Sequence, residues 1–414
     1  MNETKYWLWI SMIFGTGSRR IWEAMRLFGS AREAYEAISS GSIDLRLSES
    51  EKNNISSVTL ERAEDYIEEC RRNGIGVVGC GDAEYPPQLR NIFNPPAVLY
   101  YRGNLSCVCG TRAVTAVGAR KASDYSINVC REICGELSRN GIVIVSGFAL
   151  GTDITAHLAA ADNGRPTAAV LGCGIDREYP IENMKYRSRI LESGGVFITE
   201  YPSGTPPHSR NFPMRNRILS ALGQAALVFE ASIKSGSLIT ANLAANQGRD
   251  VFCMPPADIF SSRYFGNSSL LRDGAELLLD AQSVLDIFRF GGTAANENPV
   301  STVSYFGVGD LQPKKERSSS SSPKSGGKLK KSAAESVKQA VKDESPESGT
   351  YSFAYDELTD IQKKIYDAMN GEKIHADLLS ERLEIGLSEL MTELTELEIA
   401  GAVRSLPGKM YMPL

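Results

Sequence analysis

The stretch Ser209–Ala241, SRNFPMRNRILSALGQAALVFEASIKSGSLITA, decides the fold. Within it, the apolar run Ala226–Phe229 predicts a buried strand, and the turn Ser235–Ser237 opens a helix of small residues. A helix that begins in this way has free backbone N–H groups, which favour an anion. Three arginines, whose forked donors suit phosphate oxygens, surround the Phe-Pro step: Arg210, Arg215 and Arg217. The stretch therefore predicts a strand–turn–helix unit that binds phosphate, either of a nucleotide or of a nucleic-acid strand.

Similar units recur upstream and downstream of this stretch. Short, apolar runs that alternate with helical stretches predict strands at Ala113–Val117, Ile142–Val145, Thr167–Leu171, Gly195–Thr199, Ala226–Glu230 and Asp250–Met254. Strands that are apolar throughout indicate a parallel sheet buried on both faces. We therefore expect an α/β fold, an extended Rossmann-like doubly wound parallel sheet whose ligand crevice lies at the carboxyl ends of the strands. Ile75–Val78 and Val98–Tyr101 are expected to add strands at one edge.

Changes in composition divide the 414 residues into four predicted segments. Residues 1–70 predict a small helical domain, either a helix-hairpin-helix (SAM-like) module that grips DNA or a plain helical bundle. Residues 71–290 are expected to hold the extended Rossmann-like domain with its phosphate-binding turns. Residues 291–355, rich in Ser and Lys, predict a disordered linker. Residues 356–414 show three helical periodicities, the third of them at Leu387–Ile399, followed by a two-stranded wing, which predicts a winged helix.

Charge is distributed unevenly among these segments. The whole chain carries a net charge of −5, residues 356–414 carry −6 and residues 109–290 carry +1. The helix expected to read DNA in the winged helix carries four carboxylates: Glu389, Glu393, Glu396 and Glu398. Carboxylates on that helix repel a polyanion, so we expect this acidic domain to bind protein instead.

Several classes of protein do not fit the sequence. No segment approaches ~20 uninterrupted apolar residues, and the N-terminus fits a signal peptide poorly, which predicts a cytoplasmic protein. Eight scattered cysteines without a CxxC pair, and only three histidines, predict reduced thiols and no metal. Neither GxGxxG nor GxxxxGK[ST] occurs, so we expect no nucleotide cofactor. His157 and Cys173 are interpreted as packing residues, so no convincing catalytic set remains.

The turns at the predicted carboxyl edge carry the candidate phosphate ligands, which combine glycines, hydroxyls and cations. They are Gly118, Arg120, Lys121, Ser146, Gly147, Gly151, Gly174, Lys185, Arg210, Arg215, Asn216, Arg217, Ser235, Gly236 and Ser237. Phe212 and Tyr179 are candidates either for stacking a base or for the core. An alternative that remains open is an enzyme, a nucleotide phosphoribohydrolase on a similar sheet, with Glu200 and Glu230 as its carboxylates.

Six motifs in this order resemble the DNA-processing protein DprA (Smf) family. They are VGARKAS, SGFALGTDITAH, VLGCGIDREYPIEN, FPMRNRILSAL, VFEASIKSGSLITA and GNSSLLRDGA. The resemblance covers roughly residues 10–290 and includes the tail as the family's variable winged helix. The turns depart from the family pattern in three places: Ala119 stands for Ser, Thr152 for Ile, and Met254-Pro-Pro for Val-Pro-Gly. None of these changes removes a cation.

The resemblance implies a function that the residues alone leave open. It implies a homodimer with no catalytic role that binds single-stranded DNA in a basic pocket, protects incoming DNA and helps to load RecA during natural transformation. Single-strand-binding protein is a further implied partner. By position, Arg120 corresponds to the family's VGSR arginine, Arg215 and Arg217 to its RNR pair, and 235–240 to its SGSLIT turn.

Overall fold

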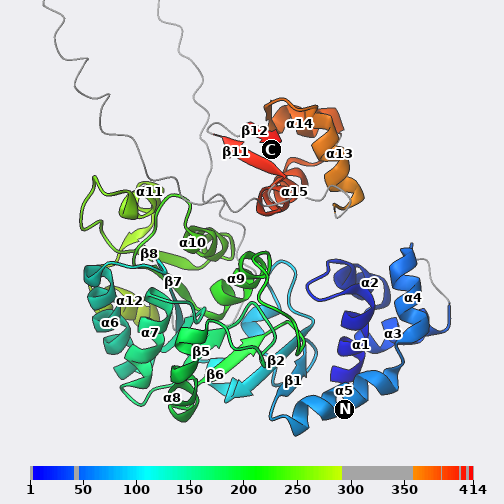
Figure 1. Cartoon of the computed structure of the whole chain (residues 1–414), viewed down its shortest axis with the longest axis horizontal. Helices are drawn as coiled ribbons and strands as arrows, with labels where there is room; N and C mark the ends of the chain where they lie inside the picture. The colour runs from blue at the N-terminus through cyan, green and yellow to red at the C-terminus, as the bar shows by residue number, and fades with distance from the viewer. Residues whose placement is uncertain are drawn as a thin grey trace, which may run out of the picture. The chain divides into compact units, whose positions relative to one another are not determined.

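The computed structural model describes residues 3–41, 46–290, 358–383, 385–400, 402–406 and 410–413. The chain divides into two compact units, Met1–Thr293 and Ala294–Leu414, each of which is treated by itself (Figure 1). The linker predicted for residues 291–355 lies outside the described residues. Within the described ranges, no helix has the length and apolar character needed to cross a membrane.

A nine-stranded sheet forms the centre of the first unit, in the order β1-β2-β6-β5-β4-β3-β7-β8-β9. Its strands are β1 (Gly76–Gly79), β2 (Val98–Gly103), β3 (Ala113–Val117), β4 (Val143–Ser146), β5 (Thr167–Val170), β6 (Val196–Thr199), β7 (Ala225–Val228), β8 (Asp250–Cys253) and β9 (Glu276–Leu277). From β6 to β9 all neighbours pair in parallel, and β1 and β2 add antiparallel pairing at one edge. The predicted doubly wound sheet is confirmed, and the order reverses between β3 and β7.

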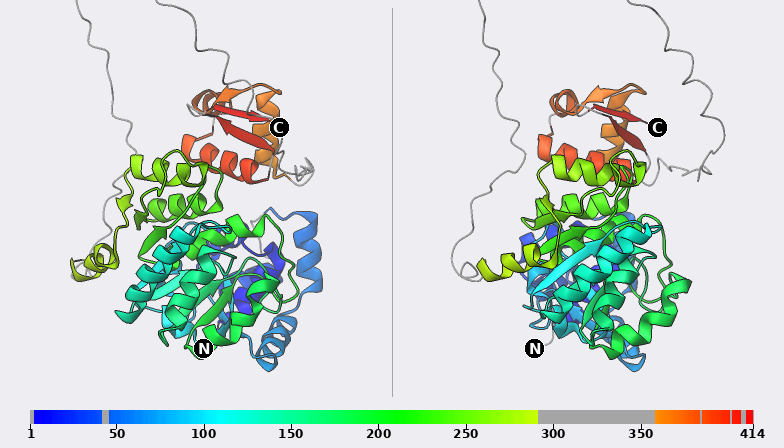
Figure 2. Two further views of the ribbon diagram at one scale, coloured as in Figure 1. Left: turned by 60° about the vertical axis from the view of Figure 1, so that its left-hand side comes forward. Right: turned by 90° about the vertical axis from the view of Figure 1, so that its left-hand side faces the viewer.

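Helices cover both faces of the sheet, as Figures 1 and 2 show. One face packs on α6 (Asp124–Arg139), α7 (Thr152–Ala161) and α12 (Ala281–Phe290), and the other on α9 (Asn211–Leu222) and α10 (Gly236–Asn246). The remaining helices of the sheet domain are α8 (Arg187–Glu192), α11 (Phe265–Arg272) and the 3-10 turns η1 (Pro87–Leu89), η2 (Leu105–Val108), η3 (Ile181–Tyr186) and η4 (Ser262–Tyr264). Val114 and Ala116 belong to one core cluster, and Ala113 and Val117 to the other, because successive side chains of a strand point to opposite faces. This double burial explains why the strands are apolar throughout.

Five helices precede the sheet and lie beside β1 and β2 (Figure 1). They are α1 (Thr4–Phe14), α2 (Arg20–Phe28), α3 (Ala31–Ser39), α4 (Glu49–Ser57) and α5 (Leu60–Arg72). Ser30, Ser48 and Thr59 cap α3, α4 and α5 by accepting from backbone N–H groups in the first turn. The Gly-rich turn before α2 faces the sheet domain, since Asn94 Nδ2 donates to Gly17 O at 2.7 Å. This placement favours the plain helical bundle over a helix-hairpin-helix that presents the turn to DNA.

The second unit has the winged-helix pattern. Its elements are α13 (Asp360–Met369), β10 (Ile374–His375), α14 (Ala376–Leu383), α15 (Leu387–Ile399), β11 (Val403–Leu406) and β12 (Met410–Pro413), and its sheet has the order β10-β12-β11. The sequence did not predict β10, which is only two residues long. Gln362 Nε2 donates to Glu393 at 3.0 Å and to Glu396 at 2.9 Å, so two of the glutamates that we expected to face outward from α15 are tied to α13.

Candidate nucleic-acid interface

A pocket opens where the carboxyl ends of β4 and β5 meet the β3–α6 loop and the first turn of α9. It has a cavity volume of about 60 Å³. Its lining residues are Arg120, Gly147, Ala149, Leu150, Leu171, Gly172, Cys173, Tyr179, Pro180, Phe212 and Arg215. The pocket thus combines two cations with two aromatic rings at the edge where a doubly wound sheet binds ligands.

Phe212 lies at the centre of this arrangement. The Arg120 guanidinium stands 5.7 Å from the centroid of the Phe212 ring. The centroids of the Tyr179 and Phe212 rings are 5.5 Å apart, and the two ring planes form an angle of 39°. Arg120 is exposed, and both rings are half-buried. A Cβ at Gly172 would lie 2.8 Å from Phe212 Cδ1, so only glycine leaves room for the ring here. The three side chains form a platform that suits a flat, uncharged group beside an anion.

Arg215 lies at the back of the pocket, where it is only 5% exposed. Its guanidinium donates to Gly147 O at 3.1 Å and to Val170 O. The neighbouring Asp153 carboxylate accepts from Gly147 N and Ala149 N at 3.1 and 3.3 Å. Burial raises the pKa of Asp153, and the positive charge of Arg215 opposes that rise. Arg215 therefore contributes a fixed positive charge to the pocket while it also ties two strand ends together.

Arg217 does not lie at the pocket, in contrast to what the sequence indicated. Its guanidinium pairs with Glu200 at 2.6 and 2.9 Å, both side chains are under 10% exposed, and Arg217 Nε donates to Asn94 O at 2.9 Å. Two residues along a helix correspond to about 200° of rotation, so Arg215 and Arg217 leave α9 on nearly opposite sides. The expected phosphate ligand is instead half of a buried ion pair that joins α9 to the Asn94 loop.

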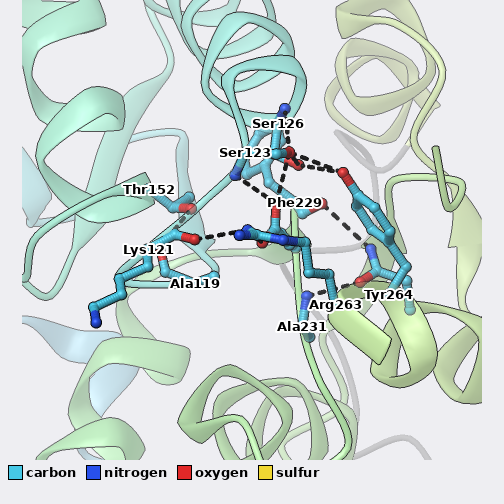
Figure 3. Close-up of polar contacts among 11 residues, drawn as sticks. Ala119, Lys121, Ser123, Ser126, Thr152, Phe229, Ala231, Arg263 and Tyr264 are labelled. Carbon is cyan, nitrogen blue, oxygen red and sulfur yellow. Dashed lines mark hydrogen bonds and ion pairs between the residues drawn. The ribbon is translucent and has the colours of Figure 1, made fainter. Parts of the chain in front are cut away.

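A second cluster lies between the carboxyl ends of β3 and β7 (Figure 3). Glu230, which is 1% exposed, accepts from both Ser123 N and Ser123 Oγ at 2.8 Å. Arg263 Nη1 donates to Glu230 Oε1 at 3.0 Å and to Lys121 O at 2.9 Å. Burial acts to raise the pKa of Glu230, but the hydrogen bonds from Ser123, Ser126 and Arg263 outweigh it and hold the pKa below its usual value.

This cluster occupies the place where a dinucleotide-binding fold holds phosphate. The strand order reverses between β3 and β7, and Ser123 is the N-cap of α6, so a ligand anion is expected there. The Glu230 carboxylate fills that position instead. The β3–α6 loop is also held from its other side, because Thr152 N donates to Ala119 O at 3.2 Å. The loop that carries Arg120 is therefore fixed at both flanks.

Four other predicted ligands make close packing contacts within the turns. Ser146 is fully buried and donates to Ala116 O at 2.6 Å. A Cβ at Gly118 would lie 2.5 Å from Thr152 Oγ1, at Gly151 2.4 Å from Ala119 O, and at Gly174 2.6 Å from Asp176 Oδ1. These glycines are required for packing at the edge, and their backbone does not line the pocket.

The remaining predicted ligands lie around the pocket rather than in it. Ser235 caps α10 by accepting from Ser237 N at 3.3 Å, and Asn216 Nδ2 donates to Gly236 O at 3.5 Å, so this turn packs beside α9. Three cations are exposed: Lys121 and Arg210 in loops, and Lys185 in η3. Lys185 Nζ lies 5.0 Å from the Tyr186 ring centroid.

Two potentially reactive side chains behave as packing residues. Burial lowers the pKa of His157 to about 3, and its Nδ1 lies 2.7 Å from Thr167 Oγ1. Burial also raises the pKa of Cys173 to about 11. At neutral pH the imidazole is therefore uncharged and the thiol is protonated. Among the described residues, no cluster of His, Cys, Asp or Glu is arranged to hold a metal ion.

The sequence missed several contributors to the two sites. Leu150 and Pro180 line the pocket and lie within two of the quoted motifs, but neither was predicted to be a site residue. Arg263 lies 33 residues from Glu230 in the chain. Tyr264, whose hydroxyl lies 2.8 Å from Ser123 Oγ, is 141 residues from Ser123. No local pattern links such distant residues. The available signal was the Glu230 carboxylate, two residues after β7, and it was interpreted as a possible catalytic group.

Comparisons with known proteins agree with this architecture. The family model described as DNA recombination-mediator protein A matches residues 76–289, and the DprA winged helix domain matches residues 352–409. Protein Smf of Escherichia coli strain K12 is 30% identical over 324 residues, which cover 78% of this chain and 74% of that protein. DNA processing protein DprA of Streptococcus pneumoniae is 38% identical over 206 residues, 50% of this chain and 72% of that protein.

A solved structure supports the same assignment. The X-ray structure of DNA processing protein A from Streptococcus pneumoniae aligns with a TM-score of 0.60 and 30% identity, over 69% of this chain and 98% of that chain. The order of motifs, the sheet with its winged helix, and these matches lead to one assignment. The chain belongs to the DNA recombination-mediator protein A family, also called DprA or Smf.

Proposed function

We propose that this protein is a recombination mediator that binds single-stranded DNA in the pocket formed by Arg120, Phe212, Tyr179 and Arg215. The observation that carries the proposal is the cation–aromatic platform, with Arg120 5.7 Å from the Phe212 ring and Tyr179 5.5 Å from it. An unpaired base stacks on an aromatic face, and its neighbouring phosphate is attracted to an arginine. Both groups are present within one small opening.

The preference for single strands follows from the same geometry. The bases of a duplex are stacked on one another, so their faces are closed to Phe212 and Tyr179. Proteins that read a duplex insert a helix or ribbon into a groove, whereas the pocket is a small opening formed by strand-end loops and the start of α9. Because every base has a π-face, binding here is expected to depend little on base sequence.

The geometry favours binding over nucleotide hydrolysis. Glu200 is paired with the buried Arg217, and Glu230 accepts hydrogen bonds from Ser123 and pairs with Arg263, so both carboxylates of the phosphoribohydrolase alternative already have partners. The cavity of about 60 Å³ is also far smaller than the roughly 300 Å³ or more of sites that enclose a small ligand. A chain that crosses the opening and inserts one base edge fits this volume better than an enclosed mononucleotide.

The finer biological role is also a proposal. We infer that the protein acts in the cytoplasm, protects incoming strands and helps to load RecA during natural transformation. Single-strand-binding protein is a further proposed partner. Membership of the family supports these roles. A homodimer is supported by two exposed side chains at one edge of the sheet: Leu277 in the edge strand β9 is 52% exposed, and Leu279, two residues after it, is 67% exposed. Light scattering of wild type and of Leu279→Arg tests it: a dimer that becomes a monomer is expected, and a monomeric wild type would contradict it.

A titration of a fluorescently labelled oligothymidine, set beside a nucleoside-monophosphate hydrolysis assay, tests the proposed function. We expect saturable binding that a single strand of another sequence competes away far better than a blunt duplex of equal length. Phe212→Ala should weaken the binding, whereas Arg165→Ala, a charge change in the α7–β5 turn at the other end of the strands, should not. Equal competition by the duplex, or nucleotide hydrolysis without oligonucleotide binding, would overturn the proposal.

A further inference from the structure

Phe93 is a large aromatic side chain that the proposed pocket does not use. It is 69% exposed, although it lies in the loop between η1 and β2 rather than at a chain end. The Arg19 guanidinium stands 5.1 Å from the centroid of the Phe93 ring. The pair repeats the combination found in the pocket, where Arg120 stands 5.7 Å from the Phe212 ring.

The loop holds the Phe93 ring in a fixed outward position. Its neighbours Ile92 and Asn94 are 9% and 8% exposed, so the chain is anchored on both sides of the exposed residue. Asn94 adopts a φ of 53° and donates from Nδ2 to Gly17 O at 2.7 Å. Trp22 Nε1 donates to Pro95 O at 3.0 Å, which ties the same loop to α2. An aromatic ring that is already fixed loses little conformational entropy when a ligand stacks on it.

The Phe93 loop also contacts the helix that carries Phe212. Arg217 donates from Nε to Asn94 O at 2.9 Å and from Nη1 to Met214 O at 3.3 Å. One guanidinium therefore bridges the residue after Phe93 and a residue in the first turn of α9. The two aromatic platforms are joined through a single buried side chain, and its partner Glu200 directly follows β6 at the carboxyl edge where the pocket also lies.

We propose that Phe93 and Arg19 form a second stacking site for single-stranded nucleic acid, which receives a base several nucleotides away from the base held by Phe212. This inference rests on the proposed function, because the strand reaches Phe93 only after it is held at the pocket. Proteins that bind single strands without sequence preference use successive aromatic platforms along a basic track. The Arg217 bridge then fixes the spacing between the two platforms.

The length of the oligonucleotide provides the test. Oligothymidines of about 4 and about 16 nucleotides are titrated against wild type, Phe93→Ala and Phe212→Ala. Phe93→Ala should weaken binding of the longer strand about 5- to 10-fold and leave the short one unchanged, since the short strand does not span both platforms. Phe93→Trp should restore the affinity for the longer strand. Leu27→Ala, which removes another exposed apolar side chain from α2, is the matched control.

The outcomes separate this inference from the proposed function. If Phe212→Ala weakens both lengths and Phe93→Ala weakens neither, or weakens both equally, the second site is overturned and the pocket stands. If no substitution at Phe212 changes binding of either length, the pocket itself fails. Thermal unfolding of each variant serves as the check on folding, and Phe93→Ala is expected to unfold at the wild-type temperature because the ring is mostly exposed.

Discussion

Two places at the carboxyl edge of the sheet are suited to an anion, and the protein treats them differently. Between β3 and β7, Glu230 fills the position at the N-terminus of α6 with an internal carboxylate. At the ends of β4 and β5, Arg120 and Phe212 leave an opening backed by Arg215. A helix N-terminus with a glycine-rich turn is therefore insufficient to identify a site. Such a position is available to a ligand anion only where the chain does not place a carboxylate of its own there.

The largest expected effect concerns the arginine that the fold uses for itself. Arg217→Ala should lower the free energy of unfolding by about 3 to 5 kcal/mol, because it leaves the buried Glu200 carboxylate unpaired. Denaturant unfolding measures it. Arg217→Met combined with Glu200→Gln should recover part of the loss. A stable Arg217→Ala protein with weakened DNA binding would return Arg217 to the list of phosphate ligands.

The second effect concerns the open site. Phe212→Ala should weaken binding of a single strand by about 1 to 3 kcal/mol, the usual contribution of one base–aromatic stack. Phe212→Tyr keeps the ring and is expected to bind nearly as well as wild type. Fluorescence anisotropy with a labelled oligothymidine measures both. Equal losses for the alanine and tyrosine variants would mean that the ring packs in the core instead of stacking a base.

The third effect concerns Glu230, the carboxylate that fills the position between β3 and β7. Glu230→Gln should destabilise the protein by about 1 to 3 kcal/mol at pH 7, because a neutral amide cannot serve Ser123 and Arg263 as a carboxylate does. The pKa of Glu230 is lowered in the folded state, so its stabilising effect is present above the usual value of 4.5 and is lost as the pH falls through the folded-state pKa.

The matching measurement is unfolding of both proteins across the acidic range. Wild type should lose more stability than Glu230→Gln between pH 6 and the folded-state pKa, and the two curves should converge at lower pH. Parallel curves over the whole range would show that the pKa of Glu230 is the same in the folded and unfolded states, which would contradict the lowered folded-state pKa. Arg263→Gln should weaken single-strand binding only in a protein that keeps Arg120, because Arg263 acts by holding the β3–α6 loop that carries Arg120.

The smallest expected effect concerns the acidic tail. A protein truncated after Tyr355 should bind a single strand within about twofold of wild type, because residues 356–414 carry a net charge of −6. Glu393 and Glu396 are tied to Gln362, yet they still add negative potential near α15. A truncated protein that loses most of its affinity at moderate salt would make the winged helix a DNA-binding domain.

Much of the fold was predictable because its signals are local. Every predicted strand of the sheet is confirmed within about two residues, since apolar β-branched runs between turns are read directly from the sequence. Helix α15 was predicted with the observed bounds from its leucine spacing. Arg120 and Phe212 were each predicted as candidate site residues. Their contact with each other was not predicted, because the two residues are 92 positions apart in the chain.

The rest depended on tertiary contacts. An arginine of α9 faces the pocket or the core according to the partners that it contacts. The partners of Arg217 are Glu200 and Asn94, which come from other parts of the chain and are not evident from the local sequence. The filling of the β3–β7 crevice needs Arg263, which follows a different strand. The two-residue strand β10 has no pattern of its own and forms because β12 pairs with it.

The salt dependence of single-strand binding by Arg120→Ala tests the central claim most directly. Each phosphate contact contributes roughly 0.7 to the slope of log affinity against log salt concentration for single strands. If Arg120 holds a phosphate at the open pocket, the variant should bind more weakly and lose about that much slope, while Arg165→Ala keeps the wild-type slope. Binding curves of Arg120→Ala that overlay those of wild type across the salt series would contradict the account.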